Sequence, residues 1–211
     1  MQFALLIELE EMLFDTRLMR ATALQMALRA EGVTLAIDAV LEAHAGSTAV
    51  MALDTLRALP LDPLGRELVL RRTSDAVRRA FDARLPSFDA SVRDAIVQLS
   101  TELPIGIVTR AGRDDAMRLL EHAALDVCVR TVQSLGDLAR ADHHRVWSVA
   151  ASKMLGAQAV AVVPNQLASG ARTAGIRTIT VATEERNFGA TLVSLVRSDA
   201  SFGVSLSAFA E

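Results

Sequence analysis

The feature that most constrains the fold is a long stretch without strand-like sequence that follows the first apolar run. Residues 3–9 form that run, whereas residues 15–85 contain no run typical of a strand. Within the stretch apolar residues recur at helical spacing. Those expected on one face of the first helix are Leu18, Ala21, Leu24 and Leu28. We therefore predict an all-helical insert, with helices at 16–31, 36–44, 47–59 and 63–83.

Outside the insert, apolar runs alternate with amphipathic segments. Strands are expected at 3–9, 105–109, 127–132, 159–163 and 177–181, and helices at 88–102, 113–125, 141–155, 165–174 and 189–197. Residues 105–108 and 160–163 are short apolar runs, as strands buried on both faces of a parallel sheet should be. The pattern predicts an α/β fold with a mainly parallel sheet.

Charge, hydropathy and cysteine usage exclude several classes of protein. The chain has 22 basic and 25 acidic residues, so it lacks the excess of cations that nucleic-acid binding requires. No apolar run approaches the ~18 residues of a membrane-spanning helix, and we expect no membrane association. Cys128 is the single cysteine, which excludes an internal disulfide framework and a cysteine-rich metal site. A reducing compartment, the cytoplasm, is therefore expected.

Five segments resemble the motifs of one protein family in their order and spacing. They are Ile7–Thr16, His44–Ser47, Ile107–Arg110, Ala174–Ile179 and Asp199–Leu206. Together they resemble the haloacid dehalogenase (HAD) superfamily, specifically the β-phosphoglucomutase-like phosphatases with a helical cap. The resemblance implies a Rossmann-like parallel sheet in an α/β core domain formed by residues 1–15 and 86–211. It also implies an inserted α-helical cap domain at 16–85.

The resemblance assigns the family's two reactive carboxylates to Glu8 and Glu10. In the family an Asp at the first position forms an aspartyl-phosphate, and an Asp two residues later acts as acid and base. Residues two apart in a strand project to the same side, so both carboxylates are expected at one site. Each extra methylene moves a carboxylate outward by roughly 1–1.5 Å, and a misplacement of ~1 Å can cost ~10²-fold in rate. Glu11 replaces the Gly that follows in the family.

The other motif positions are also altered. The family's acidic metal ligands would fall at Val163 or Pro164, and the neighbouring Asn165 is neutral. The only lysine, Lys153, lies towards the wrong end of helix 141–155, so Arg140 is the nearest candidate for the family's lysine, with Arg145 second. Thr109 is unchanged. The predicted phosphate-binding residues are therefore Thr109, Arg110 and Arg140, and no metal ligand is predicted.

These replacements predict a HAD-like protein that has lost phosphatase or phosphomutase activity and has a binding or regulatory role. The expected partner is a small phosphorylated ligand or a protein, without a cofactor. The alternative is a divergent phosphatase acting on a small phosphorylated metabolite, with Glu8 as nucleophile, Glu10 as acid/base and Mg²⁺ as cofactor. A third hypothesis is a homodimer or hetero-complex supported by the insert or by its arginine-rich helix 63–83; the other interpretation of those arginines is a solvated face.

Three further features have an ordinary structural interpretation beside a functional one. His143 and His144 suggest a metal or acid–base site, but adjacent helical residues face directions ~100° apart, so a solvated helix start is expected. Cys128 is expected to be a buried small hydrophobe in strand 127–132. Trp147, the only tryptophan, is expected to pack its helix onto the sheet.

Overall fold

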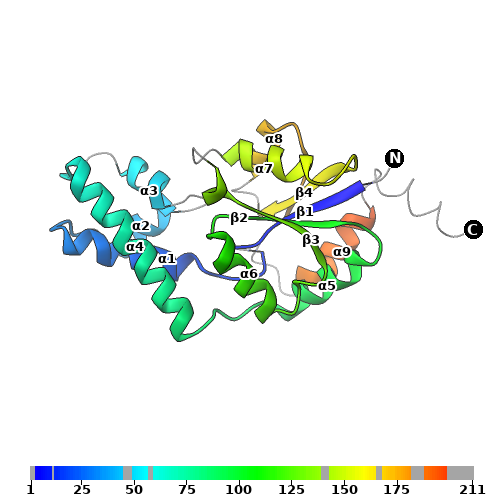
Figure 1. Ribbon diagram of the computed structural model, residues 1–211, viewed down its shortest axis with the longest axis horizontal. Coiled ribbons are helices and arrows are strands. Elements are labelled where there is room, and N and C mark those ends of the chain that lie inside the picture. The colour runs from blue at the N-terminus through cyan, green and yellow to red at the C-terminus, as the bar shows by residue number, and fades with distance from the viewer. Residues whose placement is uncertain are drawn as a thin grey trace, which may run out of the picture. The chain divides into compact units, whose positions relative to one another are not determined.

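The computed structural model describes residues 3–10, 12–44, 49–56, 59–138, 143–164, 168–181 and 188–198 (Figure 1). The chain divides into two compact units. One unit contains residues 1–14 and 87–211, and the other contains residues 15–86.

The first unit is built on a five-stranded sheet in which every ladder is parallel. Its strands are β1 (Phe3–Glu8), β2 (Ile105–Thr109), β3 (Val129–Ser134), β4 (Gln158–Pro164) and β5 (Arg177–Val181). Their order across the sheet is β3-β2-β1-β4-β5. This confirms the predicted α/β class. Because all the ladders are parallel, the carboxyl ends of β1, β2 and β4 lie at one edge of the sheet. The strand order reverses at β1, and sheets of this type bind ligands at such a point.

Helices cover both faces of the sheet (Figure 1). They are α5 (Ala90–Ser100), α6 (Arg113–His122), α7 (His143–Ser152), α8 (Ala168–Thr173) and α9 (Phe188–Ser198). The helices α7 and α8 lie on one face, and α5, α6 and α9 lie on the other. Trp147 of α7 is 3% exposed and packs in one apolar cluster with Leu6, Val108 and Val163 of the strands. The predicted packing role of Trp147 is therefore confirmed.

The second unit consists of helices in the described part of residues 15–86. They are α1 (Arg17–Ala30), α2 (Ile37–His44), α3 (Ala49–Thr55) and α4 (Pro63–Ala83). Asp62 begins α4 by accepting a hydrogen bond from the Gly65 amide at 2.6 Å, and Pro63 occupies the first turn, where its missing N–H costs nothing. No helix among the described residues is long and apolar enough to cross a bilayer.

One residue of the predicted apolar face of α1 is exposed. Ala21, Leu24 and Leu28 are buried in the core of the helical unit, but Leu18 is 60% exposed. At 3.6 residues per turn, Leu18 lies about 80° around the helix from Leu28 and falls at the margin of the buried stripe. The prediction was wrong for this residue.

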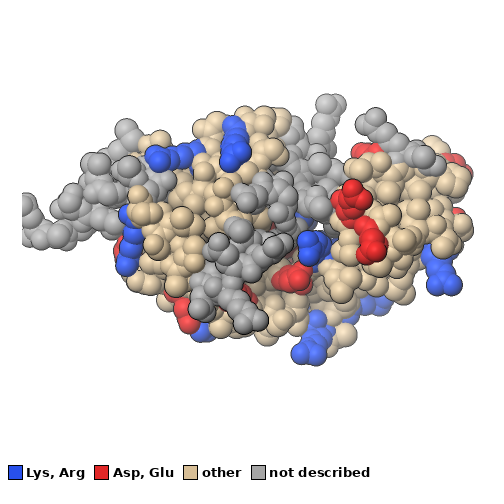
Figure 2. All heavy atoms as spheres, turned by 180° about the vertical axis from the view of Figure 1, so that it is seen from behind, with Lys and Arg blue, Asp and Glu red and all other residues tan. Residues whose placement is uncertain are grey.

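Three arginines of α4 form ion pairs on the surface of the helical unit. Arg66 pairs with Asp54 at 2.6 Å, Arg78 pairs with Asp75 at 3.0 Å, and Arg72 pairs with Glu31. On the face in Figure 2, several of the described basic side chains stand at separate places among uncharged residues. These contacts agree with the solvated-face interpretation. Exposed ion pairs of this kind contribute about 0–1 kcal/mol each.

The start of β3 differs from the prediction, and so does the environment of Cys128. The strand begins at Val129, Val127 is 85% exposed, and Cys128 is partly exposed. The reason is a turn after α6, in which Leu125 donates its amide to Leu120 and Cys128 donates its amide to Leu125. Cys128 is thus a turn residue and not a buried strand residue.

Gly106 in the middle of β2 has close neighbours where a side chain would be. A Cβ at this position would lie 2.6 Å from Leu6 Cδ2, 3.1 Å from Thr131 Cγ2 and 3.2 Å from Met154 Sδ. We expect Gly106→Val to lower the free energy of unfolding by about 1–3 kcal/mol, because the added atoms overpack the core. Urea unfolding followed by circular dichroism measures this.

The matched control for Gly106→Val is Gly112→Ala, where nothing lies within 4 Å of the added Cβ. We expect this control to stay within about 0.5 kcal/mol of the unmodified protein. Equal effects of the two substitutions would contradict the packing assigned to β2.

Candidate functional site

The candidate site lies where β1 and β2 end. Glu8 is the last residue of β1 and Thr109 is the last residue of β2. The parallel register places Glu8 beside Val108, so the residues that follow both strands emerge at the same edge. Glu8 and Thr109 are 3% and 1% exposed, so the site's polar groups are removed from water and not solvated at a strand terminus.

Glu10 does not continue β1, contrary to the prediction that Glu8 and Glu10 project from one strand. The strand ends at Glu8, and the chain turns there, with the Leu13 amide donating to the Leu9 carbonyl. The turn sends the Glu10 carboxylate towards the segment that follows β2. Glu10 is fully buried.

Three donors converge on the Glu10 carboxylate. Thr109 Oγ1 donates to Oε1 at 2.9 Å, the Ala111 amide donates to Oε1 at 2.7 Å, and the Arg110 amide donates to Oε2 at 3.1 Å. We call these three groups the oxyanion cradle. Hydrogen bonds to a charged acceptor are about twice as strong as neutral ones, and here they replace the water that the buried carboxylate has lost.

Arg110 forms a buried ion pair with Glu8. Its Nη2 and Nε atoms lie 3.1 Å and 3.2 Å from Glu8 Oε1. The two side chains are only 9% and 4% exposed. Arg110 therefore contacts both glutamates, through its guanidinium for Glu8 and through its backbone amide for Glu10.

A small pocket adjoins this ion pair. It is lined by the polar residues Glu8, Thr109 and Arg110 and by the apolar residues Val108, Leu135, Val146 and Trp147. Its volume is about 20 Å³, room for a single water molecule. All of these residues belong to the sheet-containing unit.

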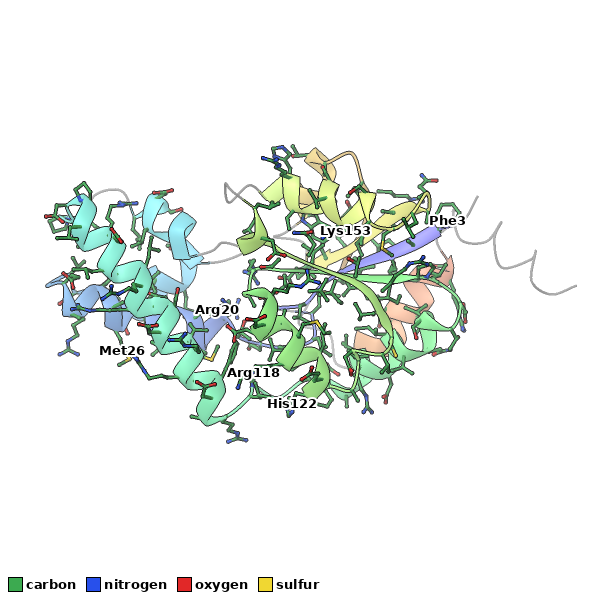
Figure 3. All side chains as sticks on the ribbon, in the orientation of Figure 1. Phe3, Arg20, Met26, Arg118, His122 and Lys153 are labelled. Atoms are coloured by element: carbon green, nitrogen blue, oxygen red, sulfur yellow. The ribbon has the colours of Figure 1, made fainter. Side chains whose placement is uncertain are left out.

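Several residues singled out in the sequence lie elsewhere or outside the described part of the chain. Arg140, Glu11, Asn165, most of the His44–Ser47 segment and the Asp199–Leu206 segment fall outside the described residues. Arg145 is exposed on α7. Lys153 follows the end of α7 and donates from Nζ to Gln133 Oε1 at 2.6 Å (Figure 3).

Comparison with solved structures identifies the architecture. A hydrolase from Pseudomonas syringae is 18% identical, with 90% of each chain covered and a TM-score of 0.72. A haloacid dehalogenase-like hydrolase from Streptococcus pneumoniae is 14% identical, with 90% of each chain covered and a TM-score of 0.71. The β-phosphoglucomutase from Clostridium difficile is 10% identical, with 99% of each chain covered and a TM-score of 0.70.

The chain has the haloacid dehalogenase-like fold. The resemblance found in the sequence is thereby confirmed at the level of the fold. No protein-family model matches the chain, and no curated protein matches it.

The described residues of this site offer few of the oxygen ligands that Mg²⁺ needs. Mg²⁺ requires several oxygen ligands in near-octahedral geometry. Val163, one of the two candidate ligand positions, follows the last β1–β4 pair, which joins Ile7 to Val162. Its apolar side chain packs in the cluster that contains Trp147 and Ala168. The Arg110 guanidinium already neutralises Glu8 from 3.1 Å. Among the residues that the structure describes, no group of three His, Cys, Asp or Glu side chains could hold a metal.

A backbone amide and a serine at a strand end help to shape this site, and neither is among the residues predicted from the sequence. The Ala111 amide is one of the three cradle donors, and Ser134 Oγ at the end of β3 donates to the Ala111 carbonyl at 2.5 Å. One signal was available. Both residues lie at or just beyond strand ends, and these ends share one edge in a parallel sheet.

Proposed function

We propose that this HAD-like protein does not transfer phosphoryl groups and acts instead by binding, with a small phosphorylated ligand or a protein as its partner. The observation that carries the proposal is the buried ion pair between Glu8 and Arg110. Glu8 stands where the resemblance puts the family's nucleophile, and its Oε1 atom is held by the Arg110 guanidinium.

A paired carboxylate is a poor nucleophile for a phosphate ester. Two nitrogens of Arg110 lie within 3.2 Å of Glu8 Oε1, which stabilises the negative charge in the ground state. Attack on phosphorus would require this charge to move onto the new bond, and the ion pair opposes that. A reacting atom also needs to come within ~3–3.5 Å of its target.

The candidate acid/base is committed as well. Glu10 accepts hydrogen bonds from Thr109 Oγ1 and from the amides of Arg110 and Ala111. A general acid must reach the substrate oxygen. The fully buried Glu10 carboxylate is instead turned towards the segment that follows β2, which supports the proposal.

The proposal includes the absence of a metal cofactor and a cytoplasmic location. The absence of a metal is supported by the ion pair at Glu8 and by Val163 and Pro164 at the positions where the family has its acidic ligands. The single cysteine suits a reducing compartment.

A phosphate-release assay tests the proposal. We expect no turnover above buffer on a panel of sugar and nucleotide phosphates, with or without Mg²⁺. We also expect titration calorimetry to show no sub-millimolar binding of Mg²⁺. The same assays are run on the Glu8→Ala variant. The matched control is Asp75→Ala, which removes an exposed acid of the helical unit. Turnover that disappears in Glu8→Ala and persists in Asp75→Ala would refute the proposal and establish a divergent phosphatase.

A further inference from the structure

Three charged groups are buried close together at the ends of β1 and β2. Glu8 and Glu10 are 3% and 0% exposed, and the Arg110 side chain is 9% exposed. Among the described residues that line the pocket, Arg110 is the one basic side chain. A carboxylate removed from water must be compensated by an opposite charge or by strong donors. Arg110 supplies that positive charge beside Glu8.

The Arg110 guanidinium is held in place from two sides. Its Nη2 and Nε atoms lie 3.1 Å and 3.2 Å from the same oxygen, Glu8 Oε1. Its backbone follows the last residue of β2, and its amide donates to Glu10 Oε2 at 3.1 Å. An arginine side chain also stays protonated at every pH at which the protein is folded. The fold therefore supplies a permanent positive charge at this position.

The guanidinium and a metal ion would compete for the same oxygen. Hard cations bind carboxylate oxygens at about 2.0–2.6 Å. An ion at that distance from Glu8 Oε1 would come close to the two Arg110 nitrogens on the same oxygen. Like charges repel strongly where little water screens them. Binding of a metal ion at Glu8 therefore requires the guanidinium to leave.

We propose that Arg110 is the built-in cation of this site. Its guanidinium holds the place beside Glu8 that a metal ion would need, and it excludes metal ions from the pocket. Removal of the guanidinium turns Glu8 into a ligand for a hard cation. The inference rests on the absence of a metal in the proposed function, and it names the group that keeps the metal out.

Terbium luminescence tests the inference. Tb³⁺ is a hard cation that prefers oxygen ligands, as Ca²⁺ does, and a nearby indole sensitises its emission. The chain has one tryptophan and no tyrosine, and Trp147 lines the same pocket as Glu8 and Arg110. On excitation of the tryptophan, we expect Arg110→Ala with Tb³⁺ to emit several-fold more strongly than the unmodified protein.

Two matched controls are measured at the same Tb³⁺ concentration. Glu8→Gln/Arg110→Ala also removes the carboxylate, and Arg78→Ala removes an exposed arginine of the helical unit. Both should emit as weakly as the unmodified protein. A gain in Arg110→Ala alone supports the inference. Strong emission from the unmodified protein, no gain in Arg110→Ala, or an equal gain in the double variant overturns it.

Circular dichroism first establishes that each variant is folded. If Arg110→Ala is not, Arg110→Met takes its place, because it keeps an apolar stem without the charge, and the same gain is expected. The absence of that gain overturns the inference. The phosphate-release assay is a separate measurement. Metal-independent turnover would refute the proposed function alone, whereas terbium emission from the unmodified protein without turnover would refute the inference.

Discussion

Replacing Arg110 with methionine is expected to lower the free energy of unfolding by about 3–5 kcal/mol. Arg110 and Glu8 are 9% and 4% exposed, and the substitution leaves the buried Glu8 carboxylate without its guanidinium. Removing one partner of a buried ion pair is costly because the remaining charge has lost its hydration. Methionine retains much of the apolar stem, so the loss reports mainly the charge. Urea unfolding followed by circular dichroism measures it.

The double variant Glu8→Gln/Arg110→Met separates the pair from its surroundings. With both charges removed, most of the lost stability should return, since replacing a whole buried pair is often close to neutral. The exposed pair of Arg78 and Asp75 is the matched control, and Arg78→Met should cost no more than about 1 kcal/mol. A loss in Arg110→Met as small as that in Arg78→Met would contradict the role given to the buried pair.

Replacing Trp147 with alanine is expected to lower the free energy of unfolding by about 3–5 kcal/mol. Trp147 is 3% exposed, joins α7 to the sheet and forms part of the wall of the pocket beside Glu8 and Arg110. Truncation removes a large buried side chain and leaves a cavity that its neighbours fill only partly. Because Trp147 is the only tryptophan, unfolding of the variant must be followed by circular dichroism.

Two further substitutions show whether volume at this position is responsible. Trp147→Phe keeps an aromatic ring and should lose less than half as much stability as Trp147→Ala. Val127→Ala, at a residue that is 85% exposed, should change stability by no more than about 0.5 kcal/mol. A comparable loss in Trp147→Phe and Trp147→Ala would point to a specific contact of the indole and not to packing.

The two predictions concern one connected structure. The apolar wall of the pocket is also part of the core beneath α7, and its polar wall is the Glu8–Arg110 pair. Through its amide, Arg110 is part of the oxyanion cradle as well. Substitutions of Arg110 should therefore also affect the contacts of Glu10. We expect the effects of Arg110 and Glu10 substitutions on the free energy of unfolding to be non-additive.

Most of the fold could be predicted from the sequence because it depends on patterns that are local. The continuous apolar runs at 105–108 and 160–163 became the fully buried strands β2 and most of β4, since a strand covered on both faces needs apolar side chains at every position. The helical spacing of apolar residues in 63–83 became α4 with the same bounds. The errors occurred at margins, such as Leu18 and Cys128, where a stripe or strand ends and neighbouring elements decide burial.

The site was only partly accessible in this way. The sequence by itself determined which residues stand at the strand ends: Glu8 after an apolar strand, Thr109 and Arg110 after another, and no acid at Val163 or Pro164. The tertiary structure alone decided their partners. Ending β1 at Glu8 turned Glu10 away from the strand and into the amides of residues 110 and 111, while the parallel register brought Arg110 onto Glu8. Pairings between groups a hundred residues apart depend on strand register and on burial. A charge that is removed from water is stabilised only by the partner that the fold places beside it. No local sequence pattern specifies that partner.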